Sequence, residues 1–348
     1  MNRIVKTAMA APLAIEQDLI TADAHPLAVL LLNPGVRFFR PEDGNGVIGY
    51  IVHGRAHVCI GGLIAAVEHK PALLRAWLDW LKQAKGFPVF VHITRQDVDV
   101  LHAAGLHINQ IGARFTIDLS TYDMQGRAFQ QLRNKISKAR KAGIRVSEIV
   151  TEADYSRLRP RLREIDAVWL KSKAAKVLRH LVTDPDCIQV PSSRRRLFIA
   201  EQDQQVLAYV VYTRVEGERP GWFHDLSRKV PDAQNGIMQA INSTALDHFK
   251  SACTSEGNGS AHRYLHFGFT PLTEMYDREH PLADLGSSHF AAIARFLADR
   301  GGVVYPARSQ RQYKMSWRPQ IIEPELIAFP KGKALASLLA LLRATDSL

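Results

Sequence analysis

The chain has 348 residues, more than one hydrophobic core usually serves, so two domains are expected. Its 46% hydrophobic and 23% charged residues exclude a disordered, collagen-like or disulfide-scaffold protein. The net charge of +11 predicts an affinity for phosphate, which a nucleic acid, an anionic membrane or a phosphorylated metabolite can offer.

The cysteines point to a reducing environment, and the hydropathy pattern points to a soluble chain. Cys59, Cys187 and Cys253 lie far apart and form no Cys-x-x-Cys pair, which excludes a zinc ribbon and a disulfide framework. No window approaches the roughly 18 apolar residues of a membrane span. We therefore expect a soluble, cytoplasmic protein.

The first part of the chain alternates strands and helices. Residues 47–62 predict a β-hairpin about His53, Gly54 and Arg55, because two β-rich runs flank a short turn. Leu74, Trp77, Leu78 and Leu81 recur at helical spacing. The predicted elements after the hairpin are a helix at 71–85, a strand at 89–93, a helix at 97–104 and a strand at 115–119.

A basic helix is predicted over residues 127–143. Its apolar positions recur at helical spacing, and Gly143 ends it. No acidic residue occurs between residues 127 and 145, whereas an ordinary solvated helix mixes both signs. A polyanion partner is favoured over a merely solvated surface. The residues expected to bind phosphates of such a polyanion, which is tRNA if the resemblance described below holds, are Arg133, Lys135, Lys138, Arg140 and Lys141.

The second part of the chain repeats the order of the first. After a helical stretch at 152–176, a hairpin is predicted from strands at 197–201 and 206–212, then a strand at 221–226, a helix at 236–252 and a strand at 264–268. The recurrence predicts two copies of one α/β unit, at 1–150 and 151–348. Residues 184–196 lack periodicity and predict a mobile loop.

One constellation lies where a predicted strand ends before a helix. Asp225 and Ser227 would share one face of the strand, and Arg228 would come where the strand gives way to a loop. Such strand ends bind ligands in α/β folds, so Asp225 can hold an ammonium group and Arg228 a phosphate or carboxylate. An ion pair between the two that merely anchors the loop is the alternative.

Other chemistries have weaker support. The loop from Arg228 to Gly236 has one glycine and includes Pro231, which lacks an N–H, so it matches the pyrophosphate cradle of CoA-dependent acetyltransferases poorly. The pairs His53/His57 and His262/His266 lie in extended segments, where four residues span roughly 13 Å. We therefore expect no metal site, and no serine-hydrolase elbow is present.

Taken together, these motifs resemble the catalytic domain of the phosphatidylglycerol lysyltransferases, also called multiple peptide resistance factors. The most specific block is Asp225-Leu226-Ser227-Arg228 followed by Pro231-Asp232-Ala233-Gln234-Asn235-Gly236. The similarity runs from Val36 to Pro330. It includes the segments 37–39, 117–120, 129–134, 139–143, 168–170, 267–272 and 313–317.

The resemblance implies two acetyltransferase-like (GNAT) units in tandem, an α/β fold, and transfer of an aminoacyl group from aminoacyl-tRNA without CoA or metal. It assigns Asp225 and Arg228 to the amino acid and to catalysis. The other expected substrate-binding residues, from the same motifs, are Asn235, Gly236, Gly268 and Lys314. Departures at Gly112-Ala113-Arg114, at Ser227 and at Lys171-Ser172-Lys173 leave the transferred amino acid and the acceptor open.

Phosphatidylglycerol is the favoured acceptor, and a soluble hydroxyl or amino compound is the alternative. The protein would then be cytoplasmic and peripheral to the inner face of the membrane. The segment 334–343 carries leucines at helical spacing and either lies on lipid or, as favoured, packs on the core. A CoA-dependent N-acyltransferase and a non-catalytic tRNA- or membrane-binding module are the competing functions.

Overall fold

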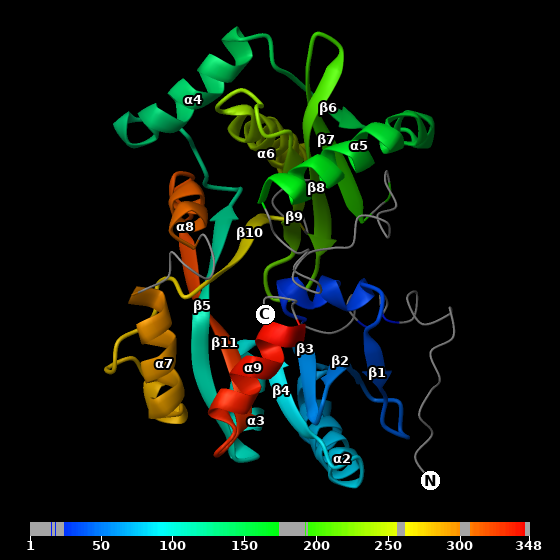
Figure 1. Cartoon of the computed structure of the whole chain (residues 1–348), viewed down its shortest axis with the longest axis vertical. Helices are drawn as coiled ribbons and strands as arrows, with labels where there is room; N and C mark the ends of the chain where they lie inside the picture. Colours follow the sequence, from blue (N-terminus) through cyan, green and yellow to red (C-terminus); the bar gives the residue numbers. More distant parts are fainter. Residues whose placement is uncertain are drawn as a thin grey trace.

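The computed structural model describes residues 24–173, 194–255, 262–299 and 307–344, together with Ile15, Asp18 and Ser192. Within these residues an 11-stranded sheet has the order β1-β2-β3-β4-β11-β5-β10-β9-β8-β7-β6, with helices on both of its faces (Figure 1). The predicted α/β class is confirmed. No helix in the described part of the chain combines the length and the apolar character needed to span a bilayer.

The N-terminal half of the sheet comes mainly from the first third of the chain. It contains the predicted hairpin, two helices and a long last strand. Its elements are the 3-10 helix η1 (Pro26–Leu32), β1 (Arg37–Phe39), β2 (Val47–His53), β3 (Ala56–Ile64), α2 (Lys70–Gln83), β4 (Phe87–Val91), α3 (Arg95–Ala103) and β5 (Leu106–Asp118).

The other half begins with the basic helix. Residues 127–129 form the 3-10 turn η3 (Arg127–Phe129), and the α-helix proper is α4 (Gln130–Lys141). The remaining elements are β6 (Arg145–Ile149), α5 (Glu152–Lys173), β7 (Arg195–Gln202), β8 (Gln205–Val215), β9 (Gly221–Lys229), α6 (Ile237–Ser255), β10 (Tyr264–Pro271), α7 (Ser288–Asp299), α8 (Ala307–Met315), β11 (Ile321–Pro330) and α9 (Ala334–Ala344). Of these, α7, β11 and α9 pack on the N-terminal half.

The strand predicted at 115–119 is longer than the sequence pattern indicates. β5 begins at Leu106, and the polar residues His107, Asn109 and Gln110 hide its first part because they interrupt the apolar pattern. Asn109 and Gln110 are buried, with side-chain bonds to the backbone around Ser287 and Glu274. Most of the loop predicted at 184–196 lies outside the described residues; within it, Ser192 forms an isolated bridge with Arg195, and Arg195 and Arg196 already belong to β7.

The predicted repeat is visible in the topology. The β3-α2-β4 segment and the β9-α6-β10 segment each join two parallel neighbouring strands through one helix. One strand of each half then pairs with the other half: β5 pairs with β10, and β11 pairs with β4. This is the arrangement expected of two acetyltransferase-like units that exchange their final strands. The sheet runs on past residue 150, so the boundary there stays a prediction.

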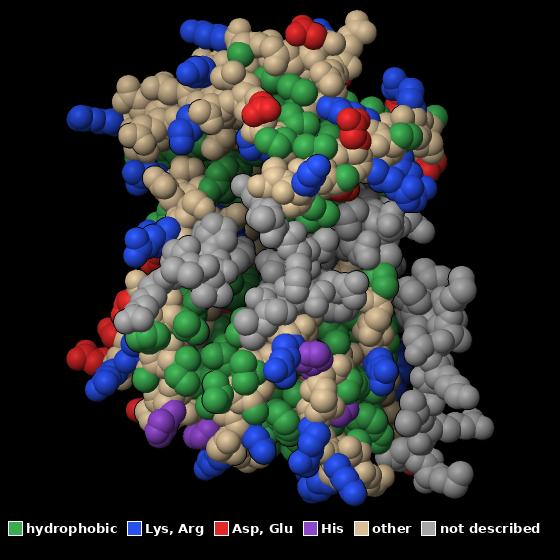
Figure 2. Space-filling view, in the orientation of Figure 1, with side chains coloured by type: hydrophobic (Ala, Val, Ile, Leu, Met, Phe, Trp, Pro, Cys, Tyr) green, Lys and Arg blue, Asp and Glu red, His purple; other side chains and the backbone are tan. Residues whose placement is uncertain are grey.

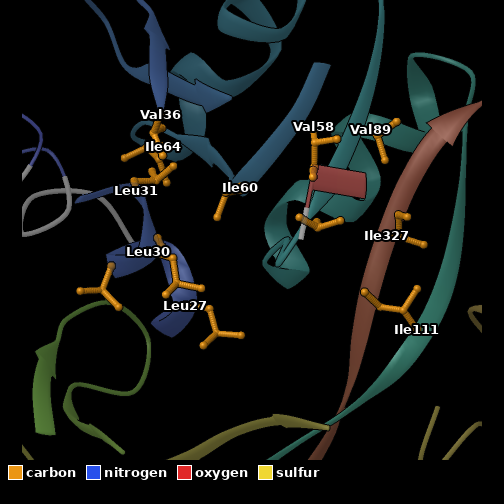
Figure 3. Close-up of a cluster of buried hydrophobic side chains, with 14 of the residues drawn as sticks. Leu27, Leu30, Leu31, Val36, Val58, Ile60, Ile64, Val89, Ile111 and Ile327 are labelled. Carbon is orange, nitrogen blue, oxygen red and sulfur yellow. The ribbon is translucent and has the colours of Figure 1, made fainter. Parts of the chain in front are cut away.

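Alternating side chains divide the core between the two faces of the sheet. In the N-terminal half, Val58 and Ile60 face η1, α7 and α9, whereas Cys59 between them faces α2 and α3. Figure 3 shows the first of these clusters, where leucines of η1 approach the valines and isoleucines of the sheet. In the other half, α4 and α6 cover one face and α5 covers the opposite face.

Candidate functional site

The site lies where β9 and β10 part. Their parallel pairing covers Tyr264–His266 opposite Gly221–Phe223. Beyond His266, β10 continues against β5 while β9 continues against β8 to Lys229. Polar side chains collect around the parted strands on both faces of the sheet.

A β-bulge places Asp225. Leu226 pairs with Val211 and His224 pairs with Tyr212, so Asp225 is the extra residue in β9. Its carboxylate accepts a 2.6 Å hydrogen bond from the hydroxyl of Thr213, and its exposed fraction is 7%. A bulge redirects a side chain that strict alternation would send to the other face.

Arg228 faces the same side as Asp225, toward α5. Its guanidinium lies 4.2 Å from the centre of the Trp169 ring, and its Nε is 3.3 Å from Asp166 Oδ1. The hydroxyl of Tyr209 donates to the same carboxylate at 2.5 Å. Burial lowers the pKa of Arg228, and the neighbouring Tyr209, Asp166 and Asp225 oppose that shift.

Two expectations change here. Strict alternation predicts that Asp225 shares a face with Ser227, but the bulge brings it to the face of Arg228 instead. The ion-pair partner of Arg228 in the described residues is Asp166, not Asp225. Sequence reasoning missed Asp166, although its position three residues before Trp169 in a helix was a usable signal, because such residues share a face.

Lys314 approaches from the opposite face. Its Nζ donates a 2.8 Å hydrogen bond to the carbonyl of Phe269 and lies 5.6 Å from the centre of the Phe115 ring. Burial lowers its pKa from 10.5 to about 7. Protonated and neutral forms of this amine therefore coexist near neutral pH.

His224 faces the same side as Lys314. Burial, and then the charge of Lys314, lowers its pKa to about 4. Its Nε2 is buried and has no hydrogen-bond partner among the described residues. A neutral imidazole thus presents an unsatisfied polar atom beside the parted strands.

A chain of hydrogen bonds not predicted from the sequence supports this side. Tyr212 donates to Asn242, which in turn donates to Tyr313, the neighbour of Lys314. Burial raises the pKa of both tyrosines, so their hydroxyls stay protonated. The three side chains come from β8, α6 and α8, which are distant in sequence.

The predicted glycines prove to be points of close approach. Gly268 has a φ of +72°, and a Cβ there would lie 2.8 Å from the ring of Phe223. Gly236 has a φ of +94°, and its Cβ would lie 2.3 Å from the carbonyl oxygen of Lys135. Gly236 therefore lets α4 pack against the start of α6, while Asn235 beside it is exposed.

The basic helix α4 presents its cations to solvent. Leu132, Ile136 and Ala139 are its buried residues, and Lys and Arg side chains project around it in the upper part of Figure 2. Arg133 has a structural role, because its guanidinium donates to the carbonyls of Met124 and Gly126 and so fixes the preceding loop. The other exposed cations of the helix are Lys135, Lys138, Arg140 and Lys141.

A group of candidate metal ligands lies elsewhere in the structure. Neither predicted His pair is helical, but His25, His92 and Glu325 meet in the core, with candidate ligand atoms within 4.8 Å of one another. The backbone N–H of Leu27 donates to His25 Nδ1, so the proton of the neutral ring lies on Nε2, facing Glu325 at 3.4 Å. That proton blocks metal binding, and the cluster fits a hydrogen-bonded charge network better.

Arg114 completes this network. Its guanidinium lies 3.4 Å from Glu323 and 3.5 Å from Glu325. The neighbouring histidines, with charge and hydrogen bonds, hold the pKa of Glu325 well below its usual range despite burial. The departure at Gly112-Ala113-Arg114 thus introduces a cation that two carboxylates of β11 neutralise.

Comparison with known proteins finds related sequences and folds. The family model described as phosphatidylglycerol lysyltransferase, C-terminal, matches residues 18–329. The phosphatidylglycerol lysyltransferase of Bacillus subtilis (strain 168) is 26% identical over an alignment of 325 positions, which covers 86% of this chain and 33% of that protein. The chain thus spans about a third of the length of this relative.

Two solved structures share the fold. The C-terminal domain of a putative lysylphosphatidylglycerol synthetase from Agrobacterium fabrum superposes with a TM-score of 0.77 at 18% identity, covering 97% of this chain and 98% of that one. L-PGS from Bacillus licheniformis gives a TM-score of 0.73 at 18% identity, with 96% of both chains covered. On these matches, the chain belongs to the phosphatidylglycerol lysyltransferase C-terminal family.

Proposed function

We propose that this protein transfers an aminoacyl group, lysyl or a similar one, from aminoacyl-tRNA to phosphatidylglycerol. The observation that carries the proposal is the β9 bulge, which turns Asp225 to the face of Arg228 beside the parted strands in a chain of this family. The activity named for the Bacillus subtilis relative is the one we carry over.

The α5 face is proposed to hold the amino acid. The carboxylate of Asp225 is suited to an ammonium group, and the Arg228 guanidinium to a carbonyl or phosphate oxygen. Asp166 and Trp169 fix Arg228 from two directions, which lowers the entropy lost when it meets a ligand. Trp169 and Asp166 are therefore positioning residues.

Lys314 is proposed to serve the proton transfer. The glycerol hydroxyl of the lipid attacks the ester carbonyl, a new C–O bond forms, and the bond to the ribose oxygen breaks. The hydroxyl proton passes to the neutral amine of Lys314, and the ammonium group so formed returns that proton to the departing ribose oxygen. A base with a pKa of about 7 suits this exchange near neutral pH.

The tRNA is proposed to lie along α4. Lys135, Lys138, Arg140 and Lys141 are exposed on a helix that has no acidic residue. Their charges neutralise phosphates and release counterions, so binding weakens steeply with salt. Asn235 and the chain around Gly236 and Gly268 would then link the tRNA side to the aminoacyl site.

We also propose two units that follow the chain, 1–150 and 151–348, in which β5 of the first pairs with β10 of the second and β11 of the second pairs with β4 of the first. α4 and β6, which precede residue 150, pack on the second unit. Because aminoacyl-tRNA is cytoplasmic and phosphatidylglycerol is a membrane lipid, the protein would work at the inner face of the membrane. No metal or cofactor is needed for an ester exchange of this kind.

The test uses tRNA charged separately with labelled lysine and other amino acids, with phosphatidylglycerol dispersed in detergent as acceptor. Label should leave the tRNA and enter the organic phase. Label that enters only water-soluble products would point to a soluble acceptor. Acyl transfer from acetyl-CoA with none from aminoacyl-tRNA would overturn the proposal.

A further inference from the structure

Helix α9 differs from an ordinary amphipathic helix in the side chains that it buries. Its buried positions are the small residues Ser337, Ala340 and Ala344, which pack on the core. Its leucines are only half-buried or exposed, and Leu335 is 59% exposed. The core packing favoured from the sequence is present, with Leu338 and Leu341 packed partly against the core, yet it leaves Leu335 exposed.

Helix α7 lies beside α9 and shows a related pattern. Its buried residues, Phe290 and Ala294, enter the same cluster as Ala340 and Ala344 of α9. Phe296 on α7 is 52% exposed. Both helices therefore point their outer faces the same way, and Figure 2 shows hydrophobic side chains gathered over this region between Lys and Arg at its edges.

The charges around this surface have one sign along α9. Residues 331–344 contain Lys331, Lys333 and Arg343 and no acidic residue. Two lysines just before a helix N-terminus oppose the helix dipole, so their placement does not serve helix stability. Leucines flanked by cations are the pattern of a helix that lies on an anionic bilayer.

The surface is also continuous with the site. The cluster beneath α9 includes Leu338 and Leu341 and extends to Phe223 of β9 and Phe269 of β10. Phe223 pairs with His266 at the point where the strands part, and Phe269 accepts the hydrogen bond of Lys314. Apolar packing thus runs from the outer helix to the place proposed for acyl exchange.

We infer that the outer face of α7 and α9, with Lys331, Lys333 and Arg343, docks the protein on an anionic phospholipid surface. This deepens the proposed function, on which it rests only in taking the lipid to be phosphatidylglycerol. The leucines enter the interface between headgroups and acyl chains, and the cations meet the lipid phosphates.

Docking is tested by sedimentation with vesicles of phosphatidylcholine alone or mixed with phosphatidylglycerol, in the absence of tRNA. The wild-type chain should prefer the mixed vesicles. Leu335→Glu should weaken that binding about tenfold. Changing Lys331 and Lys333 to Gln should weaken it about fivefold for each lysine, with the difference vanishing at high salt.

Matched controls come from the other half of the molecule. Val150 is 66% exposed between β6 and α5, and Arg159 is exposed on α5. Val150→Glu and Arg159→Gln should bind the vesicles like the wild type. If the α9 variants also bind like the wild type, or if Leu335→Glu instead abolishes self-association seen by light scattering, the docking surface is refuted.

The same variants are assayed for transfer to detergent-dispersed phosphatidylglycerol, which needs no docking. Leu335→Glu should keep this activity while losing vesicle binding. Vesicle binding as expected with no transfer by any form would refute the proposed function alone. Transfer by the wild type with no vesicle preference would refute docking alone.

Discussion

The two halves of the sheet contain the same strand-helix-strand segment, and they end it differently. In the N-terminal half, β3 and β4 pair through five residues, from Ala56 opposite Phe87 to Ile60 opposite Val91, and His92 directly after them joins the buried network of His25 and Glu325. In the other half, β9 and β10 pair through only three residues and then part around Asp225, His224 and Lys314.

Among the residues that the structure describes, each half buries one lysine, and the two lysines have different partners. Lys70 lies 2.8 Å from the carboxylate of Asp97, so its charge is neutralised. Lys314 is hydrogen-bonded to the neutral carbonyl of Phe269, and burial alone brings its pKa to about 7. A buried lysine thus belongs to the hydrophobic core where a carboxylate neutralises it, as at Lys70. Where the buried lysine meets only a neutral carbonyl, as at Lys314, it can be reactive.

Replacing Lys314 is expected to have the largest effect. Lys314→Met should lower transfer about 10²- to 10⁴-fold, because it removes the proposed proton acceptor. The same change should raise the melting temperature at pH 7 to 10, since the folded state holds this amine at a pKa below its unfolded value of 10.5. Steady-state rates and thermal melts on one preparation check both effects.

A pH profile sharpens this prediction. Transfer by the wild type should rise as the pH passes about 7, where Lys314 loses its proton. A folded Lys314→Met protein that transfers at the wild-type rate would remove Lys314 from the reaction. Lys70→Met, which breaks the paired counterpart, should instead lower the melting temperature.

The next largest effect is expected at Asp225. Asp225→Asn should lower transfer roughly 30- to 5000-fold, as removal of one partner from a desolvated charged contact costs about 2–5 kcal/mol. Binding of tRNA should not change, because Asp225 is proposed to hold the amino acid. Transfer rates and tRNA affinity, measured side by side, separate these effects.

Asp97→Asn is the matched control in the N-terminal half. It breaks the buried pair with Lys70 and should cost about 3–5 kcal/mol of stability while the folded fraction keeps its transfer rate. If Asp225→Asn behaves in the same way, with lower stability and unchanged activity, then Asp225 is a core residue like Asp97 and the comparison fails.

The basic helix packs on the half that contains the parted strands β9 and β10, and changes in it should affect only tRNA binding. Changing Lys135, Lys138 and Lys141 to Glu should weaken tRNA affinity and flatten its salt dependence by about 0.9 in log–log slope for each phosphate that is no longer neutralised. Arg133 is left intact, because its bonds to Met124 and Gly126 serve the fold. Unchanged affinity at every salt concentration would make α4 an ordinary solvated helix.

The smallest effect concerns acid stability at His266, the last paired residue before the strands part. Burial lowers its pKa to about 4, so the unfolded chain binds more protons between about pH 6.5 and 4. Stability should therefore fall as the pH drops through this range. In His266→Gln the melting temperature should vary less with pH, and an equal slope in both proteins would contradict the assignment.

The sequence predicted the local elements better than their surroundings. Hairpins and helices follow from periodicity, whereas the roles of Asp225, Arg228 and Lys314 come from motifs and stay predictions. The bulge could not be predicted, because alternation assigns Asp225 to the wrong face and only the pairing of β8 with β9 shows the extra residue. Asp166 and Tyr209 meet Arg228 through tertiary packing.

The sequence also did not predict which distant segments lie side by side. β11 lies between β4 and β5, although more than two hundred residues separate it from either in sequence, and no periodicity reveals its partners. His25, His92 and Glu325 come from three distant segments, whereas the sequence offered only close histidine pairs. Local patterns report the face that a residue occupies, but they do not report which other segment covers it.

The exchange of β5 and β11 has a consequence for how the chain folds. β11 joins the two halves by pairing with both β4 and β5, and it is the last strand in chain order within the described residues. Such distant pairing raises the contact order and slows folding, since loop entropy is lost before native contacts form. A chain ending before residue 321 would leave β4 and β5 with unpaired edges, and such edges invite aggregation.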